Sequence, residues 1–257
     1  MFNIFKLTSK SFFPYTKEAF TLYKQVTRQY KKIKKLDYVQ QLIPEKIARD
    51  ISINKNDDLT DKIDVLKPML LWFKKDFMKW MNKSISCENC KKPMDFQFLQ
   101  GNSWKLRAIE NYSCSRCKFK IVFPRYGLID KIADDRIGRC SEWSFLFGAM
   151  LNSLSIETRI VHDFLDHCWN ESLIDGKWVH IDSTLNYPIS INNPHYYEKN
   201  WHKKYNFVLA FLDTTVEDVT QSYSQEYSNI QQKRSKKFDI NSLKKIYSEI
   251  RACPKIR

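Results

Sequence analysis

Hydrophobic residues recur at steps of three and four between residues 16 and 36, which is the spacing of one face of a helix. Thr16 follows Pro14 and can cap the start of this helix. Its apolar face consists of Phe20, Tyr23, Val26, Tyr30 and Ile33. Its opposite face is basic and carries Lys24, Arg28, Lys31, Lys32, Lys34 and Lys35. The pattern therefore predicts an amphipathic helix whose basic face is either only solvated or binds a partner or an anion.

The same patterns predict further elements along the chain. Residues 61–81 are expected to be mostly helical, and Pro68 is expected either to kink this segment or to begin its second half. After Pro68 one helix face carries Leu70, Phe73, Phe77 and Met81. Further expected elements are short strands within residues 86–124, a buried helix over 139–154, two strands over 157–182 and a last helix over 242–251.

The composition is that of a globular protein. Of the 257 residues, 43% are hydrophobic and 14% aromatic, which is too apolar for a disordered chain. No apolar run approaches the ~20 residues of a membrane-spanning helix, so we expect no membrane span. The formal net charge of +14 favours acidic partners such as nucleic acid, unless the scattered lysines reflect composition alone.

Two Cys-x-x-Cys pairs predict a metal site. A gap of two residues lets both sulfurs of a pair point at one ion, and two such pairs supply the tetrahedral four-thiolate shell of structural zinc. The expected ligands of one Zn²⁺ per chain are Cys87, Cys90, Cys114 and Cys117. Four protein ligands leave no open position, so this metal is expected to stabilise the fold and to take no part in chemistry. The seven cysteines fit a reducing compartment better than a disulfide framework.

Cys140 begins the apolar stretch that predicts a buried helix. The N-terminus of a helix carries partial positive charge and free N–H groups, which stabilise a thiolate, the nucleophilic form of cysteine. The alternative is a small buried cysteine that only fills the core. We therefore treat Cys140 as a candidate nucleophile.

His167 and Asp182 are brought together by a predicted hairpin. Asp175-Gly176 is a strong two-residue turn, and counting outward from it pairs Trp169 with Asp182. His167 then lies one diagonal step from Asp182 on the same face, within reach for an imidazole and a carboxylate. The roles that follow are His167 as general base and acid and Asp182 as the group that orients its ring. The alternative for His167 is a buried histidine whose ring nitrogens are hydrogen-bonded in the core and which takes no part in catalysis.

The order of these motifs resembles the cytoplasmic peptide:N-glycanases of the transglutaminase-like superfamily. The resemblance covers roughly residues 80–225. Stretches outside the triad that resemble this family are Phe123-Pro124-Arg125-Tyr126, Gly138-Arg139-Cys140, Asn200-Trp201-His202-Lys203-Lys204 and Ala210-Phe211. Two positions depart from the family pattern: Ser141 replaces the usual glycine after the nucleophile, and Leu185 lies where an acidic residue usually follows the triad aspartate.

The resemblance implies an α+β fold. Its centre would be a transglutaminase-like or papain-like cysteine hydrolase core, with a four-cysteine zinc-binding subdomain and flanking helices. The implied regions are an N-terminal helical region over residues 1–80, the zinc-binding subdomain over 81–125, the catalytic core over 126–225 and a basic C-terminal helical tail over 226–257.

The resemblance also implies an activity and partners. The chain would remove N-linked glycans from misfolded glycoproteins through a cysteine thioester, which converts asparagine to aspartate. Substrate contacts would come from Trp80, Trp143, Trp169 and Glu171. For Trp143 and Trp169, packing in the core is an equal alternative. The basic helix would bind a proteasome-associated ubiquitin-receptor shuttle protein. The implied location is the cytoplasm, with the nucleus as a second compartment.

Two alternatives remain open from the sequence. Transglutaminase-like modules also occur in DNA-damage recognition proteins without a triad, and the charge of +14 favours such a nucleic-acid-binding relative. The intact set of Cys140, His167 and Asp182 argues against it. A protein crosslinker or deamidase that acts on glutamine uses the same acyl transfer, so the triad alone does not separate it from a glycanase.

Overall fold

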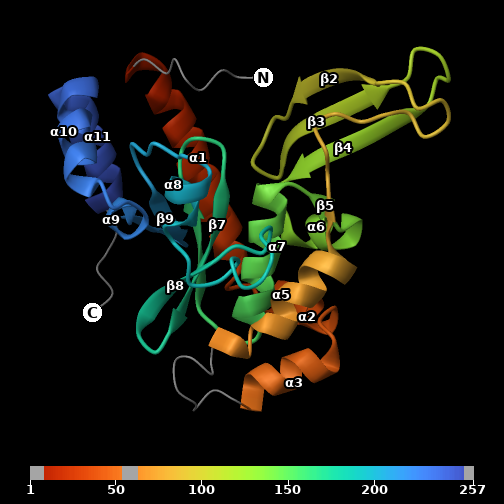
Figure 1. Cartoon of the computed structure of the whole chain (residues 1–257), viewed down its shortest axis with the longest axis horizontal. Coiled ribbons are helices and arrows are strands. Elements are labelled where there is room, and N and C mark those ends of the chain that lie inside the picture. Colours follow the sequence, from red (N-terminus) through yellow and green to blue (C-terminus); the bar gives the residue numbers. More distant parts are fainter. Residues whose placement is uncertain (1–8, 54–62, 252–257) are drawn as a thin grey trace.

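A five-stranded antiparallel sheet occupies the middle of the molecule (Figure 1). The computed structural model describes residues 9–53 and 63–251. The strands lie in the order β10-β9-β6-β7-β8. Their bounds are Thr158–His162 for β6, Cys168–Ile174 for β7, Lys177–Ile181 for β8, Leu209–Leu212 for β9 and Thr215–Asp218 for β10. This mixture of a central sheet and surrounding helices confirms the predicted α+β class.

Residues 157–182 contain three strands, so the prediction of two strands was wrong. The additional break lies between β6 and β7. There the Asp163 carboxylate accepts the N–H groups of Leu165, Asp166 and His167 at 2.9, 3.1 and 3.0 Å. An aspartate that binds several following N–H groups offers the backbone an alternative to the strand ladder. The chain therefore loops here and returns as a new strand.

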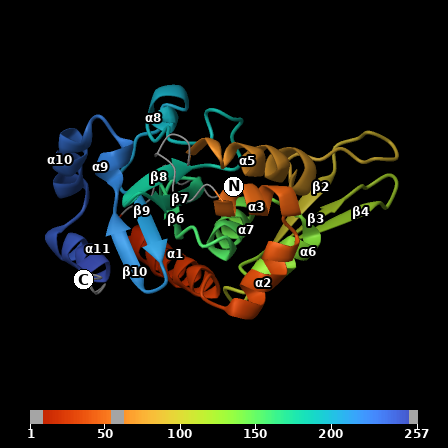
Figure 2. The same cartoon turned by 90° about the horizontal axis from the view of Figure 1, so that it is seen from below.

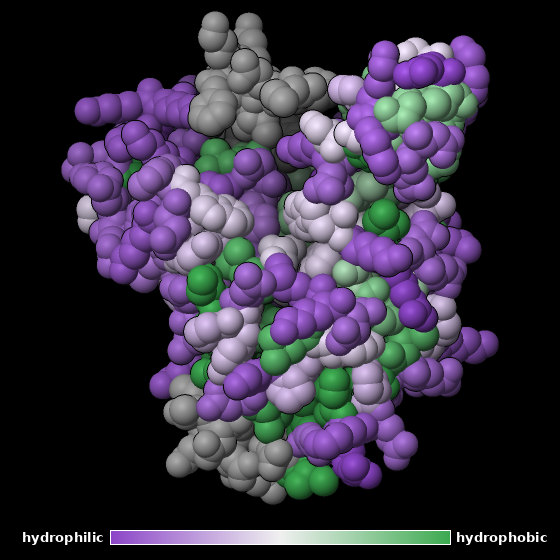
Figure 3. All heavy atoms as spheres, turned by 45° about the vertical axis from the view of Figure 1, so that its right-hand side comes forward, coloured by the Kyte–Doolittle hydropathy of each residue, from purple (hydrophilic) through white to green (hydrophobic). Residues whose placement is uncertain are grey.

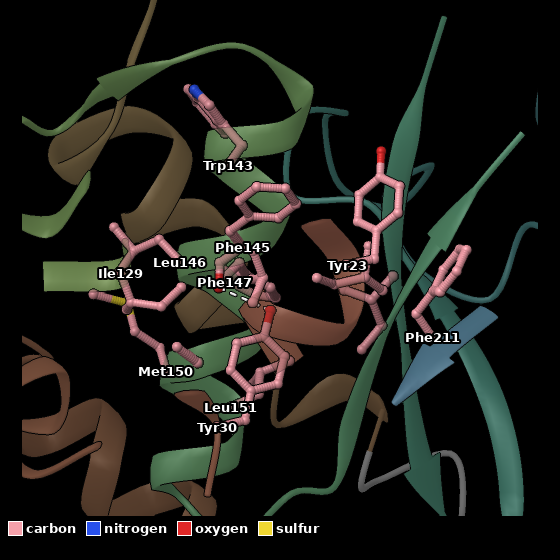
Figure 4. Close-up of a cluster of buried hydrophobic side chains, with 14 of the residues drawn as sticks. Tyr23, Tyr30, Ile129, Trp143, Phe145, Leu146, Phe147, Met150, Leu151 and Phe211 are labelled. Carbon is pink, nitrogen blue, oxygen red and sulfur yellow. Dashed lines mark hydrogen bonds between the residues drawn. The ribbon is translucent and has the colours of Figure 1, made fainter. Parts of the chain in front are cut away.

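Helix α7, Cys140–Ser153, lies against this sheet and forms the centre of the main core (Figure 4). All residues from 141 to 151 are buried, which confirms the predicted buried helix. Helices that precede α7 in the chain share this core. Their bounds are Ser9–Gln29 for α1, Ile33–Gln41 for α2, Glu45–Ile53 for α3, Lys67–Trp72 for α5 and Ile129–Asp135 for α6, with a π-helical turn, η3, at Phe73–Phe77.

Gly148 allows α7 to approach its neighbours closely. A Cβ at this position would lie 2.7 Å from Tyr30 Oη and 2.8 Å from Asn170 Nδ2. Because that space is free, the Tyr30 hydroxyl donates to the Phe145 carbonyl at 3.0 Å (Figure 4). Asn170 in β7 donates to the Ser144 carbonyl at 3.0 Å. These two bonds fix α7 between β7 and the residue that follows α1.

Helices α1 and α2 replace the single helix that the pattern predicted over residues 16–36. Thr16 lies inside α1 and does not cap it. Helix α1 contacts β9 and α7, whereas α2 contacts α7 and α6, so the chain turns at residues 30–32 to follow a different surface. Ile33 is consequently 75% exposed, while the other four predicted apolar positions are buried.

Pro68 lies in the first turn of α5 and thus begins the second half of its segment, as predicted. Proline has no backbone N–H group, but this absence has no cost in the first turn, because the first N–H groups of a helix have no hydrogen-bond partners within the helix. The four apolar positions predicted to share a face, at residues 70, 73, 77 and 81, are all buried. Leu70, Phe73 and Phe77 belong to the core around α7. The helical segment ends at Phe77, so the expectation that Met81 shares their helix face was wrong, and Met81 packs with Tyr112 and Phe123 instead.

A second, three-stranded antiparallel sheet projects from the body (Figure 1). Its strands are β2 Asp95–Gln100, β3 Leu106–Ser113 and β4 Lys120–Tyr126, in that order, which confirms the strands expected within residues 86–124. Its core is small and consists of Met81, Tyr112 and Phe123. The exposed large apolar side chains of this sheet are Phe96, Phe98, Leu99 and Val122. In the space-filling view, hydrophobic residues lie among hydrophilic ones on this part of the molecule (Figure 3).

The C-terminal helices lie at the end opposite the three-stranded sheet (Figure 2). Helix α11 contacts β10 and begins two residues before the predicted range. Helix α10 was not predicted, because only Ile230 and Arg234 are buried along it. The bounds of the helices after β8 are Tyr196–Asn200 for α8, Thr220–Tyr223 for α9, Tyr227–Lys237 for α10 and Ile240–Arg251 for α11. Among the residues with described positions, no helix combines the length and apolar character that crossing a membrane requires.

Candidate active site and metal site

Cys140 is the first residue of α7, where the chain leaves the short strand β5, Ile137–Gly138. This strand pairs in parallel with β1, Lys79–Trp80. A Cβ at Gly138 would lie 2.3 Å from the Glu142 Cβ, so glycine is needed for this approach. Glu142 folds back and accepts the N–H of Arg139 at 3.1 Å, which is one half of a capping box. The free N–H groups and positive end of α7 therefore lie beside the Cys140 sulfur.

The hairpin of β7 and β8 brings His167 and Asp182 together in the predicted register. Asp175 and Gly176 both have positive φ, 49° and 73°, as the two-residue turn requires. His167 Nε2 and Asp182 Oδ2 are 2.7 Å apart. A register shift of one residue would turn one of the two side chains to the other face of the hairpin.

Cys140 completes this arrangement. Its thiol lies beside His167 and Cys168, which lower its pKa as hydrogen-bond partners. Because Asp182 occupies Nε2 of the His167 ring, the nitrogen that faces Cys140 is Nδ1. The Cys140 sulfur also lies 3.8 Å from the carbonyl oxygen of Asp166, and the residue is partly exposed. The structure therefore brings the three predicted catalytic residues into contact in the order cysteine, histidine, aspartate.

Their charges stabilise one another. Burial alone would lower the pKa of His167, but Asp182, with a contribution from Cys140, raises this pKa to about 10. Burial would raise the pKa of Asp182, but His167 and Thr184 hold this pKa at about 2. Hydrogen bonds with Cys168 and His167 hold the pKa of Cys140 well below its ordinary value, although burial opposes them. The resting pair at neutral pH is therefore a thiolate and an imidazolium.

A buried group of charged side chains joins the start of α7 to the three-stranded sheet. Arg125 of β4 donates to Glu142 Oε1 at 2.8 Å and to Ser141 Oγ at 2.9 Å. Arg107 of β3 also pairs with Glu142 and donates to Ser141 Oγ at 2.9 Å. Ser141, which departs from the family's glycine, thus accepts two arginine hydrogen bonds next to the nucleophile.

Arg139 extends this network. Its guanidinium makes a bidentate pair with Glu110 of β3, at 2.6 Å for both bonds, and Arg125 reaches the same carboxylate at 3.1 Å. Together with Arg107 and Glu142, three arginines face two glutamates, so one positive charge remains uncompensated near the nucleophile. A nearby positive charge favours a thiolate. The sequence assigned no role to this group, although β3 carries two charged residues, Arg107 and Glu110.

The four predicted substrate-binding residues differ in their access to solvent. Trp80 is 47% exposed and lies 6.0 Å from the Trp143 ring. Trp143 and Trp169 are 2% and 0% exposed, and Trp169 Nε1 donates to the Tyr223 hydroxyl at 2.8 Å. Glu171 is buried and accepts the Tyr223 hydroxyl at 2.7 Å. Because α7 and β7 turn Trp143, Trp169 and Glu171 into the core, Trp80 is the one exposed residue of these four.

Trp201 is an exposed aromatic residue. It lies in one of the stretches that resemble the family, but the sequence predicted no function for it. It is 41% exposed, and its ring lies 5.0 Å from the His167 ring. Lys203 nearby pairs with Asp163 at 2.6 Å, which ties the segment after α8 to the loop before His167. Leu185, the second departure from the family pattern, is partly buried and packs against the cluster around Trp169.

The predicted metal ligands form one compact group. The sulfurs of Cys87, Cys90, Cys114 and Cys117 all lie within 4.8 Å of one another. Those of Cys90 and Cys114 are 3.6 Å apart, near the edge of about 3.8 Å in a tetrahedron with Zn–S bonds of about 2.3 Å. Lys91 and Lys118 follow the two pairs in the same left-handed conformation, each with φ of 58°. The two matching turns and the all-thiolate donor set therefore fit one metal ion.

Comparison with known proteins agrees with this geometry. The sequence model of a family described as the transglutaminase-like superfamily matches residues 97–183, which include the nucleophile, the histidine and the aspartate. The solved structure "Crystal structure of Rad4-Rad23 bound to a 6-4 photoproduct UV lesion" is similar over 91% of this chain and 52% of that chain, with a TM-score of 0.58. At 16% identity, this likeness concerns the fold alone. The chain belongs to the transglutaminase-like superfamily.

Within that superfamily, its sequence relatives are peptide:N-glycanases. "Peptide-N(4)-(N-acetyl-beta-glucosaminyl)asparagine amidase" of Mus musculus is 32% identical over 200 residues, covering 75% of this chain and 30% of the mouse protein. The amidase of the same name from Saccharomyces cerevisiae is 33% identical over 199 residues, covering 73% of this chain and 53% of the yeast protein. The matched part of the chain thus spans about a third to a half of the length of these curated relatives.

Glu142→Gln tests the charged network at the start of α7. The substitution leaves Arg107 and Arg125 without their shared carboxylate, and breaking a buried ion pair costs about 3–5 kcal/mol. We expect a loss of this size in the free energy of unfolding measured by urea denaturation. The control is Asp134→Asn, because Asp134 pairs with Lys131 at the surface at 3.4 Å and should contribute at most about 1 kcal/mol. Equal small losses in both variants would contradict a structural role of the network.

Proposed function

We propose that the chain is a peptide:N-glycanase, an amidase that releases N-linked glycans from misfolded glycoproteins. The observation that carries this proposal is the hydrogen-bonded group of Cys140, His167 and Asp182 in a transglutaminase-like fold. The names of the sequence relatives support the choice of substrate over glutamine crosslinking, because they describe an amidase of glycosylated asparagine.

The geometry supports a two-step acyl transfer. The Cys140 thiolate attacks the side-chain amide carbon of the glycosylated asparagine, and N–H groups at the start of α7 stabilise the oxyanion. His167 donates its Nδ1 proton to the amide nitrogen, the C–N bond breaks, and the glycosylamine leaves. Neutral His167 then takes a proton from water, whose hydroxide attacks the thioester. The thiolate is released, and the product is aspartate, while Asp182 orients the imidazole throughout.

Two exposed indoles are the best candidates for sugar contacts. Trp201 lies beside the His167 ring and Trp80 beside Trp143, in the first turn of the nucleophile helix. Partly apolar ring faces suit the apolar faces of sugars, and the partly exposed Cys140 allows an asparagine side chain to approach. A glycosylated asparagine must be presented on an accessible segment, which an unfolded polypeptide provides.

We infer that the metal held by the four cysteines is zinc, with one ion per chain. Four thiolates form a closed tetrahedral shell, so the ion would supply folding energy and no catalytic water. It would fix the loops at the end of the three-stranded sheet. That sheet carries Arg107 and Arg125 to the start of α7, so the metal would support the site indirectly.

We also propose that the basic surface of α1 and α2 binds a proteasome-associated ubiquitin-receptor shuttle protein, in the cytoplasm and with the nucleus as a second compartment. Lys32 and Lys34 are exposed and can serve an acidic partner. Three other basic residues predicted on this face form internal ion pairs: Arg28 and Lys31 with Asp213, and Lys35 with Asp130. The proposed partner surface is therefore smaller than the sequence pattern implied.

Cys140→Ala tests the proposed activity. Purified wild type is incubated with a denatured high-mannose glycoprotein, and release is followed by a mobility shift and by mass spectrometry of the conversion of asparagine to aspartate. We expect at least about a thousandfold loss of kcat/KM with an unchanged melting temperature, because the nucleophile is removed. Ser153→Ala in the last turn of the same helix is the control, with near wild-type activity. If wild type releases no glycan and binds nucleic acid with steep salt dependence, nucleic-acid binding replaces the proposal.

The pH profile tests the ion pair. The pKa of His167 is raised to about 10, so its proton is present below that value and is lost above it. Glycan release should therefore stay constant through neutral pH and fall as the pH rises through about 10. Alkylation of Cys140 by iodoacetamide needs only the thiolate and should not fall over the same range. A parallel decline of both rates would contradict a role for the His167 proton.

Metal analysis tests the four-cysteine site. We expect a zinc content near one per chain by inductively coupled plasma mass spectrometry, since the four sulfurs form a single shell. Chelation should lower the melting temperature, and Cys114→Ser should reduce both the zinc content and the stability. Cys168→Ser is the matched control, because Cys168 lies outside this group and should leave the zinc content unchanged. A metal-free protein of full stability would refute the site.

A further inference from the structure

The hydrogen bonds of the triad continue beyond Asp182. The Tyr197 hydroxyl donates to Asp182 Oδ2 at 2.8 Å, and His180 Nε2 lies 2.7 Å from the same hydroxyl. The N–H of Asn193 donates to His180 Nδ1 at 3.3 Å. Burial lowers the pKa of His180 to about 4, so this ring is neutral at pH 7. Three residues, Asn193, His180 and Tyr197, thus form a second series of hydrogen bonds that ends on Asp182.

The hydrogen bonds of this series all run in one direction, from Asn193 toward Asp182. A neutral imidazole carries one proton, and Nδ1 of His180 accepts the N–H of Asn193, so the proton is on Nε2. Nε2–H therefore donates to the Tyr197 oxygen, which leaves the single hydroxyl proton of Tyr197 for Asp182. The Asn193 N–H thus orients the His180 ring, and the His180 ring orients the Tyr197 hydroxyl toward Asp182.

Asp182 is fully occupied as a result. Its Oδ2 accepts from His167 and Tyr197, and its Oδ1 accepts from the N–H and the hydroxyl of Thr184 at 2.9 and 2.7 Å. An ionised carboxylate has about four acceptor positions, and all are used here. The carboxylate can neither rotate away from His167 nor readily take up a proton.

Tyr197 also contacts the catalytic base directly. It has no exposed surface, and its ring lies 5.4 Å from the His167 ring and 4.6 Å from the Trp169 ring. It comes from α8, whereas His167 and Asp182 come from the hairpin, so the hydroxyl links two separate elements at the base of the triad. Packing alone does not account for this hydroxyl, because phenylalanine would fill the same space.

We propose that Tyr197, oriented by His180, is a positioning residue of the active site that holds the Asp182 carboxylate against His167. Without the hydroxyl, Asp182 gains rotational freedom and stabilises the imidazolium less. The thiolate of Cys140, which depends on that imidazolium, is then stabilised less as well. The catalytic consequence rests on the proposed glycanase function, whereas the consequence for thiol reactivity does not.

Tyr197→Phe tests this proposal, with Tyr205→Phe as the matched control. Tyr205 belongs to the same buried cluster, and its hydroxyl has no hydrogen-bond partner among the described residues. The pH dependence of Cys140 alkylation by iodoacetamide is followed by peptide mass spectrometry. In Tyr197→Phe we expect the apparent pKa of the Cys140 thiol to rise by about one unit, and kcat to fall about 10- to 100-fold with little change in KM, which is the range for one hydrogen bond to a charged group. Tyr205→Phe should match wild type.

Two substitutions of His180 provide a rescue test that does not depend on Tyr197→Phe folding. His180→Gln retains an N–H donor near the position of Nε2, whereas His180→Leu removes it. We expect His180→Gln to have thiol reactivity closer to wild type than His180→Leu. Equal profiles for these two variants, or a Tyr197→Phe profile that coincides with wild type, would overturn the positioning role.

The outcomes for the two proposals are separable. If wild type releases no glycan but Tyr197→Phe still shifts the alkylation profile, the glycanase function fails and the positioning role of Tyr197 is supported. If wild type releases glycan and the alkylation profiles of wild type and Tyr197→Phe coincide, the glycanase function is supported and the positioning role is refuted.

Discussion

The first turn of α7 is the constraint on which the rest of the site depends. Glu142 lies there with only 1% of its side chain exposed, and burial would favour its neutral form. Its pKa is nevertheless about 2, because Arg125 and Arg107 face it from β4 and β3. A buried charge of this kind is tolerated only while its partners are in place. Two strands of the three-stranded sheet are therefore required to keep one helix end in its conformation, and Cys140 lies at that end.

The second part of the site depends on a strand register and not on charge. His167 and Asp182 meet because the Asp175-Gly176 turn fixes the pairing of β7 with β8. Asp163 then fixes the loop before His167 by accepting three N–H groups, and Lys203 pairs with Asp163 from the segment after α8. The nucleophile and its base are thus positioned by different parts of the chain, which meet only where α7 packs on β7.

Local rules explain which features were predictable from the sequence. The four cysteines, the nucleophile helix and the hairpin each depend on residues close together in the chain, and their spacing predicted the observed geometry. The arginine network was not predictable, because Arg107 and Glu142 meet only through tertiary folding. The burial of Trp169 was not predictable for a related reason: its position on a strand predicted a face, but whether that face meets solvent depends on Tyr197 and Tyr223. The break between α1 and α2 also depends on tertiary contacts, since the local apolar spacing continues through it.

The distribution of these partners along the chain has a consequence for the protein during its synthesis. In an unfolded chain a cysteine has a pKa of about 8.5 and is mostly a neutral thiol at pH 7. The residues that convert Cys140 into a thiolate, His167 and Asp182 among them, are translated after it, and the Tyr223 hydroxyl that binds Trp169 behind His167 comes later still. A nascent or truncated chain therefore presents a weakly reactive thiol. Chemical reactivity arises only with completion of the fold, so an unfinished copy of this protein does not expose its neighbours to an activated nucleophile.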